Sequence, residues 1–161
     1  MKLTDQKLQL DLIRAYWQRA DDNWHYPAYR RPYNWLIHTL SGRGRVELSD
    51  RSIALEPHSL VVIPLNQLCH YRCSEPMHLG ASAFTLTLDS GLDLFELYRP
   101  PSAPIPLKDS SAIAAIIEAQ DSPQSHFQAL SAMYQLLAPL IEAAALRWPR
   151  HQKATLLFLL T

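Results

Sequence analysis

Histidine and cysteine are the residue types in this sequence with the most specific chemistry, because they bind transition metals. The chain has seven histidines and two cysteines. No H-x-H pair occurs, and His38, His70 and His78 fall on different predicted strands with nothing in their spacing to make them converge. Cys69, His70 and Cys73 form C-H-x-x-C, but structural zinc normally needs two paired ligand sets and only one pair is present. The sequence therefore predicts neither a metal site nor a cofactor.

Motifs of nucleophilic catalysis and of phosphate binding are missing from the sequence. There is no G-x-S-x-G elbow, and the two cysteines lack a cationic context of the kind that lowers a thiol pKa. The G-R-G run that begins at Gly42 lies between predicted strands rather than at a strand-to-helix junction, so it is no dinucleotide loop. We predict no catalytic residue and no enzymatic activity, with an enzyme that lacks these motifs as the alternative.

Aromatic side chains are the most suggestive group of residues. They gather before and within the predicted sheet: Trp24, Tyr26, Tyr29, Tyr33, Trp35 and Tyr71. Aromatic walls with a few hydroxyls and small residues are what a preformed small-molecule pocket uses to stack and orient its ligand. Ala81 and Ala83, two small residues on one face of a predicted strand, leave room for such a ligand. The alternative, which stays open, is that the aromatic rings fill the interior of the fold.

The middle of the chain predicts three short strands divided by two turns. The glycines of residues 41–44 and the proline of residues 56–59 mark the turns. Apolar residues alternate on both sides of residues 49–51, which indicates a hairpin with one buried face. Residues 60–63 are a continuous apolar run, as expected of a strand buried on both faces. This order favours a small antiparallel barrel or sandwich.

Further elements are predicted on the N-terminal side and after the middle stretch. Residues 4–20 predict a helix, because apolar residues recur there at spacings of three and four. The other predicted elements are an extended aromatic arm over residues 24–33, a strand over 34–41, and strands over 68–73 and 78–88. In the strand over 34–41, alternation puts Trp35, Thr39 and Ser41 on one face, toward the predicted interior.

The C-terminal third predicts helices. The prolines of residues 99–106 indicate a stiff connector, and helices are predicted over residues 109–120 and 122–146. Pro139 is expected to kink the longer helix near Gln135. That helix carries an apolar stripe that we predict to form a homodimer: Phe127, Leu130, Tyr134, Leu137 and Ile141. The alternative is that the stripe docks within its own chain. Residues 154–160 are apolar, and no further element remains in the sequence to pack against them. We therefore expect either that the chain is truncated or that this segment covers a neighbouring molecule.

The middle of the sequence has a distinctive order of features: a glycine turn over residues 41–44, a hairpin, a turn containing Pro57, an apolar strand, a proline-rich turn and the strand-opening His70. This order resembles the cupin-like sensor domain that precedes the DNA-binding domain in AraC-type transcription regulators. The resemblance covers the predicted sheet well and the helical third more loosely. Two departures are that His58 stands where the turn of the family usually has Gly, and that the double helix-turn-helix region is missing from this sequence.

The resemblance implies a mainly β fold, a cupin-like (jelly-roll) antiparallel barrel with an N-terminal helix and a C-terminal helical dimerisation segment. We predict the helix, arm and effector-binding barrel in residues 1–98, and the connector and dimerisation helices in residues 99–161. Such a domain senses a small-molecule effector and reaches DNA only through the missing domain. The alternatives are a small metal-dependent cupin enzyme, an isomerase or dioxygenase, and a dimerisation module without a ligand.

Eight residues are predicted to contact the effector: Trp24, Tyr29, Trp35, Thr39, Ser41, Tyr71, Ala81 and Ala83. Ser41, Tyr71 and the two alanines match positions at which sugar-binding members of the family contact their ligands. Since Ser41 and the alanines are smaller and less polar than a sugar requires, the resemblance favours a more apolar or aromatic effector.

Composition limits the partners and the compartment. Fifteen basic and fifteen acidic side chains cancel, so the chain lacks the basic field that nucleic acid or an anionic membrane would need. Two cysteines make no disulfide framework, which predicts a reduced, cytoplasmic setting. The sequence shows no signal-peptide pattern and no apolar run near the roughly 18 residues of a membrane span.

Overall fold

Two long strands, β2 (Asn34–Glu47) and β5 (His70–Leu88), pair antiparallel and form the centre of a six-stranded sheet. The computed structural model describes residues 7–24, 30–119 and 121–146. The other strands of the sheet are β1 (Leu8–Ala20), β3 (Ser52–Leu55), β4 (Ser59–Ile63) and β7 (Ile105–Pro106). Their order is β1-β5-β2-β4-β7, with β3 paired to β2, and every pairing is antiparallel.

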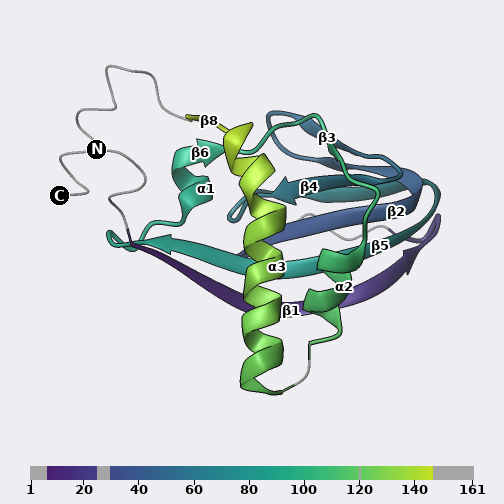
Figure 1. Cartoon of the computed structure of the whole chain (residues 1–161). Helices are drawn as coiled ribbons and strands as arrows, with labels where there is room; N and C mark the ends of the chain where they lie inside the picture. Colours follow the sequence, from purple (N-terminus) through teal and green to yellow (C-terminus); the bar gives the residue numbers. More distant parts are fainter. Residues whose placement is uncertain (1–6, 25–29, 120, 147–161) are drawn as a thin grey trace.

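Helices cover one face of this sheet (Figure 1). They are α1 (Leu94–Leu97), α2 (Ser111–Ile117) and α3 (Pro123–Glu142), and a small second sheet pairs β6 (Tyr98–Arg99) with β8 (Ala145–Leu146). The long α3 runs across the strands with α2 beside it. None of the helices in the described part of the chain has the length and apolar composition needed to cross a bilayer.

The sheet is buried on both faces, and its two faces belong to two separate hydrophobic cores. Leu36 and Phe84 pack with Ile113 of α2 and Met133 of α3 in the first core. The second core lies on the opposite face and contains the residues that alternate with these: Trp35, Ile37, Val61, Ile63, Leu79, Ala81 and Ala83 among others. The burial of residues 60–63 on both faces is thereby confirmed. The predicted alternation is confirmed for residues 34–39 but not for Ser41, because the register of β2 shifts after Thr39 and Ser41 is exposed.

The central pair of strands doubles back on itself. Tyr71 is paired with Val46, which lies eleven residues from Trp35 along β2. Eleven residues of a flat strand would span about 36 Å. Yet the guanidinium carbon of Arg31 lies 5.3 Å from the ring centre of Trp35 and 5.7 Å from that of Tyr71. The sheet must therefore curl around the second core, which encloses that face.

Asn34 fixes the start of β2 beside Trp35. Its side-chain amide donates to both carboxylate oxygens of Asp93 at 3.1 Å, and its carbonyl accepts the Leu65 backbone N–H at 2.9 Å. Asp93 also accepts the backbone N–H groups of Leu86 and Phe95 and caps α1. Burial raises the pKa of the Asp93 carboxyl, and these hydrogen bonds oppose the rise. One buried polar cluster thus joins β2, β5, α1 and the segment after β4.

The predicted N-terminal helix is wrong, because residues 8–20 form β1. A β-bulge lies between Leu12 and Arg14, so Ile13 has no partner in the register of β1 and β5. The extra residue changes which positions face the helices. Leu10 and Leu12 face them before the bulge, and Ala15 and Trp17 face them after it. Because the bulge lengthens one interval, Leu8, Leu12 and Ala15 pack against the same core at spacings of four and three. These are also the spacings of a helix, which explains the incorrect prediction.

The predicted turn at residues 41–44 is also wrong, because β2 continues through it. The register of β2 against β5 shifts three times between Thr39 and Gly44, so the glycines serve bulges rather than a reversal. Gly42 has φ +81°, and a Cβ there would lie 2.1 Å from the Pro76 carbonyl oxygen. A close approach of two backbones, rather than a tight turn, requires this glycine.

The hairpin and the second predicted turn are confirmed. Val46 pairs with Ile53 and Glu47 with Ser52, and the Leu48 N–H donates to the Arg51 carbonyl at 2.8 Å. His58 adopts φ +55°, a conformation that glycine takes more easily, at the position where the resembled family usually has Gly. His70 opens β5, although β5 is one strand of 19 residues where two were predicted.

In the C-terminal third, α2 and α3 confirm the two predicted helices, and α3 continues through Pro139. The predicted end of the longer helix at residue 146 is wrong, because α3 ends at Glu142 and residues 145–146 form β8. The proline-rich connector includes β7, which pairs with β4 and was not predicted. The predictions about Tyr26, Tyr29 and residues 154–160 fall outside the described residues.

His38 connects the sheet to the segment that leads into α2. Its side chain is fully buried, and its Nε2 lies 2.9 Å from the Leu107 carbonyl oxygen. Burial is the main cause that lowers the pKa of His38, and the carbonyl of Leu107 partly opposes it. A histidine held neutral in the fold stabilises it above its unfolded pKa of about 6.5, and this contribution is lost as the pH falls through the folded pKa.

We therefore predict that His38→Gln, which keeps an N–H for the Leu107 carbonyl but does not titrate, flattens the pH dependence of stability. Urea unfolding between pH 5 and 7.5 should show the free energy of unfolding of the wild type falling more steeply below about pH 6.5 than that of the variant. His126→Gln, which changes an exposed histidine on α3, is the control. Parallel curves for the wild type and His38→Gln would contradict the prediction.

Candidate functional site

A cavity of about 360 Å³ lies on the enclosed face of the sheet. Its walls come from β1, β2, β5 and the segment before β2: Arg14, Tyr16, Gln18, Trp24, Arg31, Trp35, Ile37, Tyr71, Leu79 and Ala81. Aromatic and aliphatic side chains make up most of this lining, with arginine, tyrosine and glutamine as polar groups. Small-molecule pockets commonly combine these types of residue and have volumes of this order.

Trp35 is the centre of the aromatic wall. Tyr16 and Tyr33 meet its ring edge-on, with ring centres 5.6 Å and 5.7 Å away. The guanidinium carbons of Arg14 and Arg31 each lie 5.3 Å from its ring centre. The side chain is buried, and its indole Nε1 has no hydrogen-bond partner among the described residues. A buried N–H without a partner costs free energy, and this nitrogen has almost no accessible surface, so the cost belongs to the packing of the fold.

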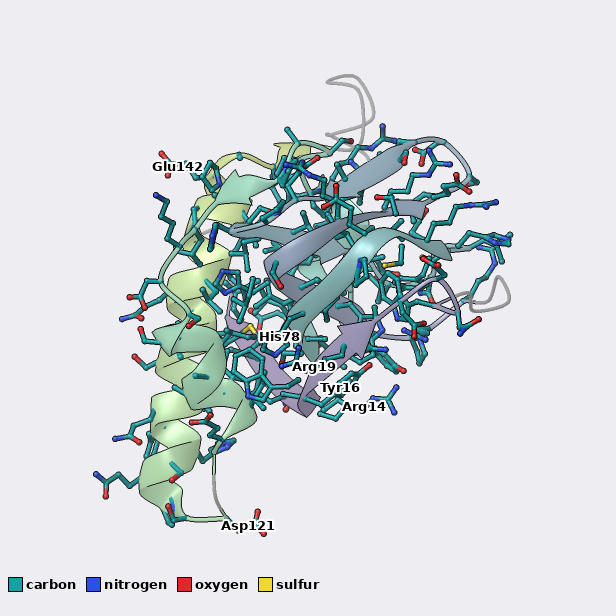
Figure 2. The ribbon with its side chains drawn as sticks, turned by 90° about the vertical axis from the view of Figure 1, so that its right-hand side faces the viewer. Arg14, Tyr16, Arg19, His78, Asp121 and Glu142 are labelled. Atoms are coloured by element: carbon teal, nitrogen blue, oxygen red, sulfur yellow. The ribbon has the colours of Figure 1, made fainter. Side chains whose placement is uncertain are left out.

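The bulge in β1 determines which side chains of that strand line the cavity. After Ile13, the residues that alternate with Ala15 and Trp17 are Arg14, Tyr16 and Gln18, and all three line the cavity. Arg14 also donates to the Tyr33 hydroxyl at 2.9 Å, which holds its guanidinium over the rings. Figure 2 shows Arg14, Tyr16 and Arg19 following one another along β1, with His78 beside Arg19. Bulges commonly re-aim side chains in this way next to functional sites.

Tyr71 closes the other side of the cavity. Its ring packs edge-on against Trp24 at 5.2 Å, and Arg31 lies over it. Burial raises the pKa of the Tyr71 phenol far above its ordinary value, so the hydroxyl stays protonated at neutral pH. Burial likewise raises the pKa of the nearby Cys69 thiol to about 11. Neither group is prepared to act as a nucleophile or base.

The structure brings four of the eight predicted ligand residues together: Trp24, Trp35, Tyr71 and Ala81 all line the cavity. Thr39 and Ala83 are fully buried and do not line it, and Ser41 is exposed on β2. Tyr29 lies outside the described residues. Sequence reasoning missed six lining residues: Arg14, Tyr16, Gln18, Arg31, Ile37 and Leu79. The three on β1 would follow from interpreting residues 8–20 as a bulged strand.

The histidines and cysteines do not gather. Among the described residues, no three side chains of histidine, cysteine, aspartate or glutamate lie close enough to hold a metal ion. His38 belongs to the helix-covered side, where it bonds Leu107, and His78 stacks beside Trp17 at 5.4 Å. Cys69 and Cys73 are both free thiols.

The residues predicted for a dimer interface divide into exposed and buried ones. Phe127 is 71% and Tyr134 47% exposed on α3, whereas Leu130 and Ile141 are partly buried. Leu137 is 1% exposed and packs in the core beneath α3, so a partner subunit has no access to it. An apolar groove lies on the outer surface of α2 and α3 and includes Phe127, Ala112 and Ala115.

Comparison with known proteins gives distant structural similarities. No family model and no curated protein matches the sequence. KdgF from Halomonas sp. is 18% identical with a TM-score of 0.39, over 53% of this chain and 84% of that one. A cupin-2 domain containing protein from Shewanella frigidimarina is 13% identical with a TM-score of 0.32, over 51% and 72%. The DMSP lyase DddQ from Ruegeria pomeroyi is 15% identical with a TM-score of 0.39, over 50% and 48%. Because these scores are low and about half of this chain is matched, the likeness carries no argument about function.

Proposed function

We propose that this chain is a cupin-like, effector-sensing domain that binds a small molecule in the cavity around Trp35. The cavity itself is the observation that carries this proposal. Aromatic rings and two arginines surround a space that neither core fills, on the face of the sheet that the helices do not cover. A filled interior, as a pure dimerisation module would have, offers no such space.

The proposed role is binding rather than catalysis. Burial keeps the phenol of Tyr71 and the nearby thiol of Cys69 protonated, which suits donors and apolar walls better than nucleophiles. Measurement of one stoichiometric transition metal in the purified protein would instead favour a small metal-dependent cupin enzyme, an isomerase or dioxygenase.

The order of sequence features that resembles AraC-type regulators supports a place for this domain in transcription regulation, with DNA bound by a further domain. The coding sequence that follows Thr161 tests this part of the proposal. Two helix-turn-helix patterns there would support a regulator, and a stop codon directly after Thr161 would overturn it.

Filling the cavity should abolish ligand binding. Ala81 lines the cavity and is 3% exposed, so Ala81→Trp places an indole where a ligand would lie, at a cost of about 1–3 kcal/mol for overpacking. A thermal-shift screen of a metabolite library should find compounds that raise the Tm of the wild type and of Ala103→Trp, an exposed change outside the cavity, but not that of Ala81→Trp. A compound that stabilises folded Ala81→Trp as strongly as the wild type would place the binding site elsewhere.

We further propose a homodimer through the exposed face of α3. From Pro123 to Ile141 this helix has no aspartate, glutamate, lysine or arginine, and its outer face carries the exposed rings of Phe127 and Tyr134. A face of this kind is costly to leave in water and fits an identical, uncharged face of a second copy.

The dimer is tested by charging that face alone. Phe127→Glu combined with Tyr134→Glu should sediment as a folded monomer at tens of micromolar, where the wild type should be a dimer. Ile13→Glu, which changes an exposed apolar residue on β1, should leave the dimer intact. Leu137 is unsuitable because its replacement would disrupt the core. A wild-type monomer, or dissociation caused by Ile13→Glu, would refute the α3 interface.

A further inference from the structure

We propose that the ligand of the cavity is a small carboxylic acid with a flat, apolar body, bound as its anion by Arg14 and Arg31. This inference rests on the proposed small-molecule binding and adds the chemical class of the ligand. It follows from the charge of the lining, from its hydrogen-bonding groups and from its shape.

The lining carries two positive charges and no negative one. Among the described residues that line the cavity, Arg14 and Arg31 are the charged ones, and none is an aspartate or glutamate. The ion pairs found among the described residues involve Arg43, Arg45, Arg72 and Arg99 and do not include Arg14. An arginine side chain stays charged at any pH that the fold survives. Two guanidinium groups that line one cavity therefore favour an anion within it.

The hydrogen-bonding groups of the cavity are mainly donors. Besides the two guanidinium groups, the Tyr71 hydroxyl of the lining is held protonated by burial. Carboxylate oxygens accept several such bonds at once, and arginine binds them in a two-point geometry. A sugar would need acceptors for its hydroxyls as well, and this lining has no carboxylate to supply them.

The apolar part of the lining selects the body of the ligand. The ring of Trp24 and the side chains of Ile37, Leu79 and Ala81 form the walls that are not charged. At about 360 Å³, the cavity is near the lower end of the range for drug-sized ligands, so one or two fused rings with a short acid side chain suit it. Flat rings stack well between tryptophan and tyrosine.

Matched acid and amide pairs test the charge preference on the wild-type protein. Isothermal titration at pH 7.5 with phenylacetate against phenylacetamide, and indole-3-acetate against indole-3-acetamide, keeps the ring and removes the charge. We expect at least one acid to bind, and to bind about tenfold or more tightly than its amide, the factor expected when charge-assisted hydrogen bonds are lost. This comparison needs no variant, so it stands even if an arginine replacement fails to fold.

Single replacements then assign the charge to its residues. Arg14→Gln and Arg31→Gln should each weaken binding of the preferred acid about tenfold and bring its affinity closer to that of the amide. Arg19→Gln is the matched control, because Arg19 lies on the same strand but does not line the cavity (Figure 2). Its affinity for the acid should equal that of the wild type.

Three results would overturn the inference: equal affinity for an acid and its amide, acid binding that neither arginine replacement weakens, or no acid binding at millimolar concentrations. None of these results bears on whether the cavity senses a ligand, which the metabolite screen with Ala81→Trp decides separately. If that screen found only neutral compounds, the proposal that the cavity binds a small molecule would stand. The proposal that its ligand is a carboxylic acid would fail.

Discussion

The doubling back of β2 and β5 is the constraint on which the rest of the structure depends. Because the two strands curl until Trp35 and Tyr71 both contact the guanidinium of Arg31, a single sheet acquires one enclosed face and one open face. Helices α2 and α3 cover the open face and complete its core. The enclosed face needs no further layer, so the space that its side chains leave is the cavity.

The elements that sequence reasoning predicted correctly are those with a regular period. Trp35 and Leu36 fall in different cores because successive side chains of a strand point to opposite faces, and both faces here are apolar. In β1 the same reasoning failed, since one extra residue, Ile13, breaks the period and leaves a helix-like spacing. The glycines near Gly42 misled for a related reason: glycine permits a bulge as well as a turn, and only the approach of Pro76 decides between them.

Four of the ten residues that line the cavity could be recognised from residue type, and the other six could not. Trp24, Trp35 and Tyr71 stand out because buried aromatic side chains near a predicted sheet have few other places to go. Arg14 and Arg31 do not, because an arginine in a supposed helix or arm is typical of a solvated surface, and its contact with Trp35 depends on the bulge and the curl. Leu137 shows the same limit on α3, where an apolar stripe does not reveal which of its members face the sheet.

The most direct test of the account follows the indole N–H signals of the tryptophans by NMR while phenylacetate is added. Trp35 lies at the centre of the cavity with its Nε1 buried, whereas Trp17 packs on the helix-covered side of the sheet. The account predicts a saturable shift of the Trp35 signal that Arg14→Gln weakens, with the Trp17 signal unchanged. A shift confined to Trp17, or a Trp35 signal that moves at millimolar concentrations of neither phenylacetate nor, in a parallel titration, indole-3-acetate, would contradict it.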